Sequence, residues 1–143
     1  MPFLKIEGGH NLTGEVFISG SKNSALCILV ASLLFDGRIT INNVPNIMDI
    51  TMMLEIFDNL NINYEMEKNT VIVNSNELAS TRVMHQNCQQ FRASYYFMGA
   101  LLGRYHEVDI LYPGGCQIGK RPIDFHLMGF EALGGNISFL DES

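Results

Sequence analysis

The chain has 143 residues, of which 47% are hydrophobic and 17% are charged, and its formal net charge is -6. This length and composition exclude a disordered chain and suit either one globular domain or a piece of a larger one. The negative charge argues against a general nucleic-acid binder, which needs a basic face, but not against small anionic ligands held by a few cations.

The first half of the chain predicts a helix, a strand, a second helix and two further strands. Residues 25–34 are apolar at helical spacing, Asp36 and Gly37 interrupt them, and residues 38–41 alternate as a strand. After a proline turn, a second helix is predicted over residues 49–60, with Asp49 as its N-cap. Strands over residues 63–66 and 70–73 complete this unit.

The second half of the chain repeats the same order. Residues 93–102 predict an apolar helix that ends before Gly103, and a strand follows over residues 108–110. A second proline turn leads to a helix over residues 124–133, capped by Asp124, and then to a strand over residues 136–139. The pattern therefore predicts an α/β fold made of about two repeated α-β-α-β-β units, with small sheets packed on buried helices. The second unit stops before its last strand, so we expect the chain to be part of a longer one.

Neither a membrane span nor a metal site is predicted. The N-terminus lacks a basic stretch followed by an apolar one, and the longest apolar run, residues 25–35, is too short to cross a bilayer. We therefore expect a soluble cytoplasmic protein with no membrane or nucleic-acid partner. The three cysteines, Cys27, Cys88 and Cys116, include no CxxC pair, so neither a disulfide framework nor a zinc site is indicated.

The residues best suited to binding and catalysis lie in a glycine- and proline-rich loop over residues 112–126. Cys116 stands near Lys120 and Arg121, and such cations favour the thiolate and create a site for an anion. Glycine amides beside them can donate to a phosphate or a carboxylate. From composition alone, a functional loop and a plain turn with a passive cysteine are about equally open. Cys27 is expected to be buried in its apolar helix, and Cys88 to be structural or neutral, so Cys116 is predicted to be the only strongly reactive thiol.

Two further groups stand at the starts of the apolar helices. In residues 19–24, Ser21 can cap the first helix, and Lys22 and Asn23 offer polar groups at its N-terminus, where anions are attracted. The spacing is not that of a phosphate-binding Walker loop, and an ordinary capped turn explains this segment equally well. Arg92 begins the second helix, where an arginine is more often a solvated surface group.

Three motifs together resemble the UDP-N-acetylglucosamine enolpyruvyl transferases, also called 1-carboxyvinyltransferases. They are GSKNSA at residues 20–25, RAS at residues 92–94 and PGGCQIGKRPID at residues 113–124. The last string is highly specific, and the related shikimate-pathway synthases lack its cysteine loop. The resemblance covers the whole chain but only the N-terminal portion of the family's longer sequence.

The resemblance implies both a fold and an activity. Family members have two domains, each an inside-out α/β barrel of three repeated units. Here residues 1–21 would pair with the second domain and residues 22–143 would form most of two repeats. The family transfers the enolpyruvyl group of phosphoenolpyruvate to the 3-hydroxyl of UDP-N-acetylglucosamine, releasing phosphate, in the first committed step of peptidoglycan precursor synthesis. It supports cell wall formation, cell shape and division, and it uses no metal or other cofactor.

The resemblance also implies the site residues. Cys116 would be the general acid, able to form a covalent adduct with phosphoenolpyruvate and to be alkylated by fosfomycin. The residues expected at the phosphoenolpyruvate site are Lys22, Asn23, Cys116 and Arg121. Those expected at the UDP-N-acetylglucosamine site are Asn23, Arg92, Arg121, Pro122, Ile123, Asp124 and Phe125. The catalytic base matches no residue here and would lie in the second domain. The alternatives are an enolpyruvyl transferase with another acceptor and a non-catalytic binding fragment.

Overall fold

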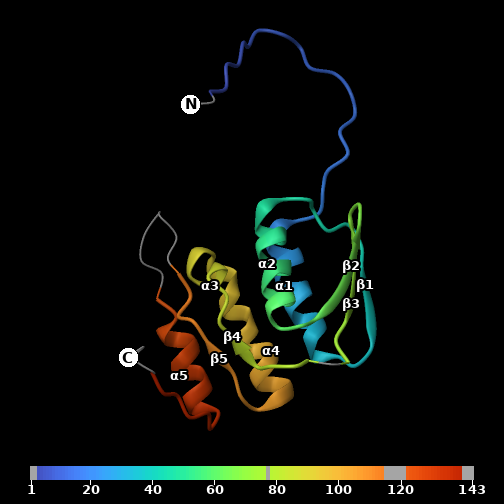
Figure 1. The fold of residues 1–143 in the computed structure, drawn as a ribbon. Coiled ribbons are helices and arrows are strands. Elements are labelled where there is room, and N and C mark those ends of the chain that lie inside the picture. Colours follow the sequence, from blue (N-terminus) through green and yellow to red (C-terminus); the bar gives the residue numbers. More distant parts are fainter. Residues whose placement is uncertain (1–2, 77, 115–121, 140–143) are drawn as a thin grey trace.

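The computed structural model describes residues 3–76, 78–114 and 122–139. Residues 3–19 form no helix or strand and extend away from the rest of the chain (Figure 1). Their apolar side chains face solvent: Val16, Phe17 and Ile18 are 81%, 98% and 83% exposed. Two α/β units follow this segment.

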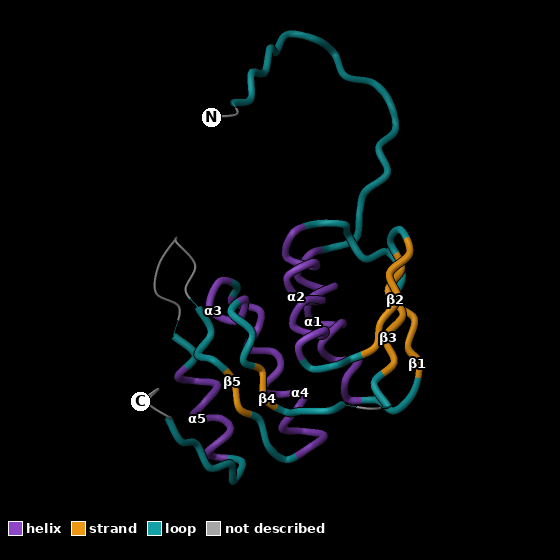
Figure 2. The backbone as a smooth tube through the Cα atoms, in the orientation of Figure 1, coloured by secondary structure: helices purple, strands orange, loops and turns teal. Residues whose placement is uncertain are grey.

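The first unit has the predicted order of elements. It comprises α1 (Lys22–Ala31), η1 (Ser32–Leu34), β1 (Arg38–Ile41), α2 (Met48–Asn59), β2 (Asn63–Glu67) and β3 (Thr70–Asn74). The strand β3 lies between β1 and β2 and pairs antiparallel with both (Figure 2). Val71 and Val73 on alternate positions of β3 are fully buried, as expected of a strand with one face against helices.

The second unit is less regular than predicted. It comprises β4 (Arg82–Val83), α3 (Asn87–Gln90), η2 (Arg92–Tyr95), α4 (Tyr96–Tyr105), β5 (Asp109–Ile110) and α5 (Asp124–Ala132). The strands β4 and β5 form a short parallel pair, and neither β4 nor α3 was predicted. The predicted helix over residues 93–102 exists as η2 and α4, and the predicted strand over residues 108–110 and helix over residues 124–133 correspond to β5 and α5.

Two predicted features of this unit are wrong. The helix α4 continues through Gly103 and ends at Tyr105. His106 caps it, with a left-handed φ of 65° and an amide that donates to the Leu102 carbonyl. Residues 136–139 are not a strand. A strand needs a neighbour for its backbone hydrogen bonds, and residues 136–139 pair with no other segment of the described chain.

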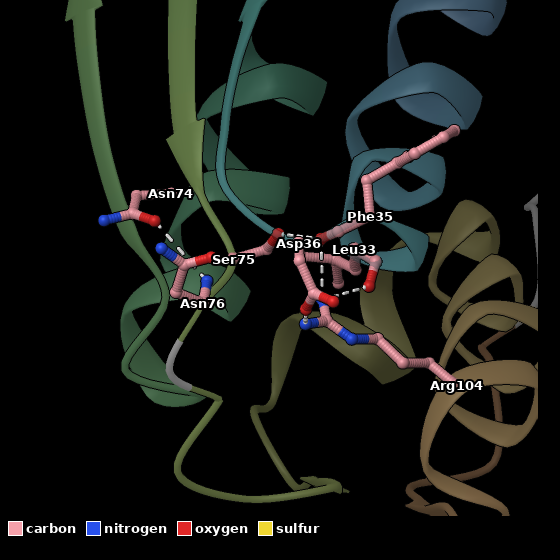
Figure 3. Close-up of polar contacts among 7 residues, drawn as sticks. All are labelled: Leu33, Phe35, Asp36, Asn74, Ser75, Asn76 and Arg104. Carbon is pink, nitrogen blue, oxygen red and sulfur yellow. Dashed lines mark hydrogen bonds and ion pairs between the residues drawn. The ribbon is translucent and has the colours of Figure 1, made fainter.

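An aromatic contact and a half-buried arginine join the two units. The rings of Phe57 on α2 and Phe97 on α4 meet edge to face, with centroids 6.0 Å apart, and both side chains are fully buried. Arg104 on α4 donates to the carbonyls of Leu33 and Phe35, each at 2.8 Å, and also pairs with Asp36 (Figure 3). The repeat units therefore share one core, which fixes α4 against α1.

The helices pack together and the three-stranded sheet lies on their outer side (Figure 1). In that view α1, α2, α4 and α5 all begin at the upper end and run downward. The predicted α/β class with sheets on buried helices is confirmed, although the described residues do not close into a barrel. No helix in the described ranges is long and apolar enough to span a membrane.

Candidate functional site

The first predicted cation, Lys22, stands at the start of α1. Ser21 caps this helix as expected, because its side chain accepts a hydrogen bond from the Ser24 amide at 3.5 Å. The ammonium of Lys22 donates to a carboxylate oxygen of Asp49 at 2.7 Å, in the first turn of α2. Asn23 is exposed beside it. The starts of α1 and α2 thus lie together, and Lys22 already has an anionic partner in this chain.

Gly20 allows the starts of α1 and α2 to lie together, because two backbone segments approach closely at this position. A Cβ at Gly20 would lie 1.7 Å from the carbonyl oxygen of Asn43, a residue with a left-handed φ of 59°. Any side chain at position 20 would therefore push the entry to α1 away from the loop before α2. The glycine of the GSKNSA motif serves close backbone packing, which places Lys22 beside Asp49.

Arg92 lies at the start of η2 and reaches the segment that was predicted to share its ligand. Its guanidinium donates to the Pro122 carbonyl at 3.4 Å and lies over the ring of Tyr95, 5.4 Å from the centroid. Side chains three residues apart eclipse on a 3-10 helix, which explains the stacking of Arg92 on Tyr95. Residues 30 positions apart in the sequence are therefore in contact.

Residues 122–125 lead into α5 and form its first positions, and they combine one buried side chain with three exposed ones. Ile123 is 3% exposed, whereas Pro122, Asp124 and Phe125 are exposed, Phe125 to 86%. The predicted N-caps at Asp49 and Asp124 are wrong: the caps are Ile47 and Ile123, and both carboxylates lie in the first helical turn. There they still favour the helix because they face the positive end of its dipole.

The residues that precede Cys116 in the cysteine loop are hydrogen-bonded to α3. The Gly114 amide donates to the Cys88 carbonyl at 3.0 Å, and a Cβ at Gly114 would lie 1.3 Å from the Gln89 carbonyl oxygen. Only glycine fits this approach of two backbones. Cys116 and Arg121, and Lys120 beside them, lie outside the described residues.

Of the other two cysteines, Cys27 is not buried as expected, whereas Cys88 is buried. Cys27 was expected to be buried but is exposed, because α1 buries Ala25, Leu26, Leu29 and Val30 and the thiol lies on its other face. Cys88 is fully buried, and burial raises the pKa of its thiol to about 11. A neutral buried thiol is unreactive, so Cys88 is structural and Cys27 is the more accessible of the two.

Sequence reasoning missed the aromatic residues around Arg92. The rings of Tyr95 and His126 lie 4.8 Å apart, and those of Tyr95 and Tyr96 lie 4.6 Å apart. A hydrogen bond with Tyr95 and burial raise the pKa of Tyr96 to about 12. The only signal in the sequence was the position of these tyrosines directly after the RAS motif.

This arrangement suits the binding of anions. Two cations stand at helix starts, where the backbone amides and the helix dipole also favour negative charge. No group of three or more His, Cys, Asp or Glu side chains among the described residues could hold a metal ion. Two hollows of about 430 and 380 Å³ lie elsewhere, beside residues 78–82 and between α4 and the end of α5, and neither is lined by Lys22 or Arg92. The predicted site residues in the described part of the chain therefore line neither hollow.

Comparison with known proteins defines the family. The family model described as EPSP synthase (3-phosphoshikimate 1-carboxyvinyltransferase) matches residues 6–143, almost the whole chain. The chain belongs to this family. Its fold is that of an enolpyruvyl transferase: a crystal structure of the enolpyruvyl transferase NikO from Streptomyces tendae matches with a TM-score of 0.59 at 24% identity, covering 66% of this chain and 22% of that one.

Individual family members are more similar in sequence. A protein of Campylobacter jejuni named UDP-N-acetylglucosamine 1-carboxyvinyltransferase is 41% identical over 137 residues, which are 96% of this chain and 33% of the relative. A Staphylococcus haemolyticus protein named UDP-N-acetylglucosamine 1-carboxyvinyltransferase 1 is 42% identical over 140 residues, 98% of this chain and 32% of the relative. The chain spans about a third of the length of these relatives.

Proposed function

We propose that this chain forms the N-terminal portion of an enzyme that transfers the enolpyruvyl group of phosphoenolpyruvate to the 3-hydroxyl of UDP-N-acetylglucosamine. Residues 22–143 would supply most of two repeats of one domain. Residues 1–21 would pair with a second domain, and the exposed apolar side chains of residues 3–18 support such a role. The names of relatives at 41% and 42% identity support this acceptor.

The observation that carries the proposal is the contact between Arg92 and Pro122. The RAS motif and the RPID part of the cysteine-loop motif are both proposed to bind the nucleotide sugar. The 3.4 Å hydrogen bond from Arg92 to the Pro122 carbonyl joins their described parts into one surface. Arg92 would supply positive charge to the diphosphate, and the exposed side chains of Asp124 and Phe125, which follow Pro122 in the chain, would offer an acceptor and an apolar face. Arg121, Ile123 and Asn23 are the other residues proposed to contact the nucleotide sugar.

The proposed chemistry is an addition followed by an elimination. The Cys116 thiol protonates the methylene carbon of phosphoenolpyruvate while the sugar 3-oxygen bonds to the adjacent carbon and loses its proton to a base in the second domain. The resulting intermediate loses a methyl proton and phosphate, which restores the double bond. Cys116 can alternatively add to phosphoenolpyruvate as a covalent adduct, and fosfomycin would alkylate the same sulfur.

Lys22, Asn23 and Arg121 are proposed to hold the phosphate of phosphoenolpyruvate. Bringing two anionic substrates together requires cations that offset their repulsion, and their effect is greatest in a site that excludes water. Lys22 pairs with Asp49 at 2.7 Å, so a substrate phosphate would have to compete with this carboxylate for the ammonium. The cell-level role that follows is cytoplasmic peptidoglycan precursor synthesis, and through it cell shape and division.

The experiment uses a completed enzyme, in which this chain replaces the matched 137 residues of the Campylobacter jejuni relative. Phosphoenolpyruvate is offered with UDP-N-acetylglucosamine or with shikimate 3-phosphate, and the enolpyruvyl product is identified by mass spectrometry. We expect product from UDP-N-acetylglucosamine alone. A folded completed enzyme that modifies shikimate 3-phosphate at least as well would show that the acceptor is wrong.

A further inference from the structure

Tyr95 lies at the meeting point of three elements. It is the last residue of η2, and the Arg92 guanidinium lies over its ring, 5.4 Å from the centroid. The same ring packs against that of His126 on α5, with centroids 4.8 Å apart. Its hydroxyl oxygen is hydrogen-bonded by Tyr96, the first residue of α4. The ring of Tyr95 is thus the part that faces Arg92 and His126.

The contact between Tyr95 and His126 helps to position α5, because this helix is otherwise lightly packed. None of its residues is buried, and a hollow of about 380 Å³, lined in part by Gly99 and Phe130, lies between α4 and the C-terminal end of α5. At its N-terminal end, by contrast, Ile123 is buried, Arg92 reaches Pro122, and His126 packs on Tyr95. The start of α5 is therefore held mainly where the proposed nucleotide-sugar surface lies.

We propose that Tyr95 is a positioning residue for nucleotide-sugar binding, an inference that rests on the proposed function. The face of its ring holds the Arg92 guanidinium toward Pro122. The contact of the ring with His126 holds the first turn of α5 against η2. Binding then meets a surface that is already ordered, so less side-chain freedom is lost when the ligand binds. Since the ring provides both contacts, phenylalanine can replace tyrosine here and leucine cannot.

The first test measures the cluster itself and does not depend on enzyme activity. A tyrosine ring in contact with His126 displaces the proton resonances of that imidazole. We expect these resonances in the 143-residue chain to move toward ordinary values in Tyr95→Leu and to stay nearly unchanged in Tyr95→Phe. Identical His126 resonances in wild type and Tyr95→Leu would overturn the packing on which the inference rests.

The second test separates positioning from folding in the completed enzyme. Losing a cation–π contact and the order it imposes predicts that Tyr95→Leu raises the KM for UDP-N-acetylglucosamine about tenfold. The kcat and the KM for phosphoenolpyruvate should change less than about twofold, and Tyr95→Phe should retain the wild-type values. The matched control is Tyr105→Leu, which removes a tyrosine that also carries an arginine, Arg104 at 5.1 Å, at the far end of α4.

The outcomes distinguish this inference from the proposed function. A completed enzyme that uses another acceptor would refute the proposed function, while the His126 resonances would still report on the cluster. If UDP-N-acetylglucosamine is the acceptor, equal KM values in wild type and Tyr95→Leu would overturn the positioning role. Equal increases in Tyr95→Leu and Tyr105→Leu would also overturn it, because they would indicate a general loss of stability.

Discussion

Replacing Arg104 with methionine should destabilise the fold much more than replacing an exposed arginine. The Arg104 side chain is only 15% exposed, and it donates to two carbonyls and to Asp36 (Figure 3). Asp36 is 87% exposed and returns to water, and the Phe35 carbonyl keeps the hydroxyl of Ser75 as a donor. The carbonyl of Leu33, a residue 1% exposed, loses this donor.

The magnitude follows from these three acceptors. A hydrogen bond from a charged donor contributes about 1.5–3 kcal/mol, and leaving a buried acceptor unpaired costs about 1–3 kcal/mol. Since two of the acceptors keep other partners, Arg104→Met should cost about 2–4 kcal/mol. The control is Arg38→Met, whose ion pair with Glu65 is 61% and 72% exposed and should contribute less than about 1 kcal/mol.

Urea unfolding followed by circular dichroism measures both variants. With a slope of about 2 kcal/mol per molar urea, the midpoint should fall by about 1–2 M in Arg104→Met and by less than about 0.5 M in Arg38→Met. Asp36→Asn should resemble the control, because the exposed amide oxygen can still accept a hydrogen bond. Equal shifts in the two arginine variants, or the full loss in Asp36→Asn, would refute the assignment of the cost to the buried carbonyl.

Exposure and close contacts predict three other responses. Brief alkylation of the native chain, followed by peptide mapping, should modify Cys27 and spare Cys88, whose pKa is raised to about 11; protection of Cys27 would contradict its exposure. Lys22→Met should change the free energy of unfolding by less than about 1 kcal/mol, since its ion pair is half exposed, while raising the KM for phosphoenolpyruvate in the completed enzyme. A large loss of stability would make this cation structural. Gly114→Ala should lower the melting temperature, because its Cβ would lie 1.3 Å from a backbone carbonyl oxygen. Gly99→Ala, with open space around it, should instead stabilise α4 by roughly 0.5–1 kcal/mol. The opposite order of stabilities would contradict the close approach at Gly114.

The first unit could be predicted from sequence because each of its elements carries its own local signal. Residues 38–41 and 70–73 alternate, Gly37 interrupts the chain between α1 and β1, and the structure has strands at these positions. The second unit depends more on contacts between distant residues. The strand β4 has two residues that pair with β5, and a two-residue strand leaves no periodic pattern to recognise.

The site could be predicted as a set of residues but not as a geometry. Motifs indicated Lys22 and Arg92, yet their partners, Asp49 and Pro122, come from other elements and could not be read from the sequence. The burial of Cys27 was predicted wrongly because the mean hydropathy of a helix does not tell which face is covered. The roles of Cys116 and Arg121, which lie outside the described residues, stay predictions.

Phosphate release from phosphoenolpyruvate by the completed enzyme tests the central claim most directly. We predict that release requires UDP-N-acetylglucosamine and falls by a factor of about a hundred to ten thousand in Cys116→Ala, the range typical of a lost general acid. The 143-residue chain alone should release no phosphate, because the proposed base and the closing domain are supplied by the rest of the enzyme. A folded Cys116→Ala variant that retains full activity, or a 143-residue chain as active as the completed enzyme, would contradict the proposed role of this chain.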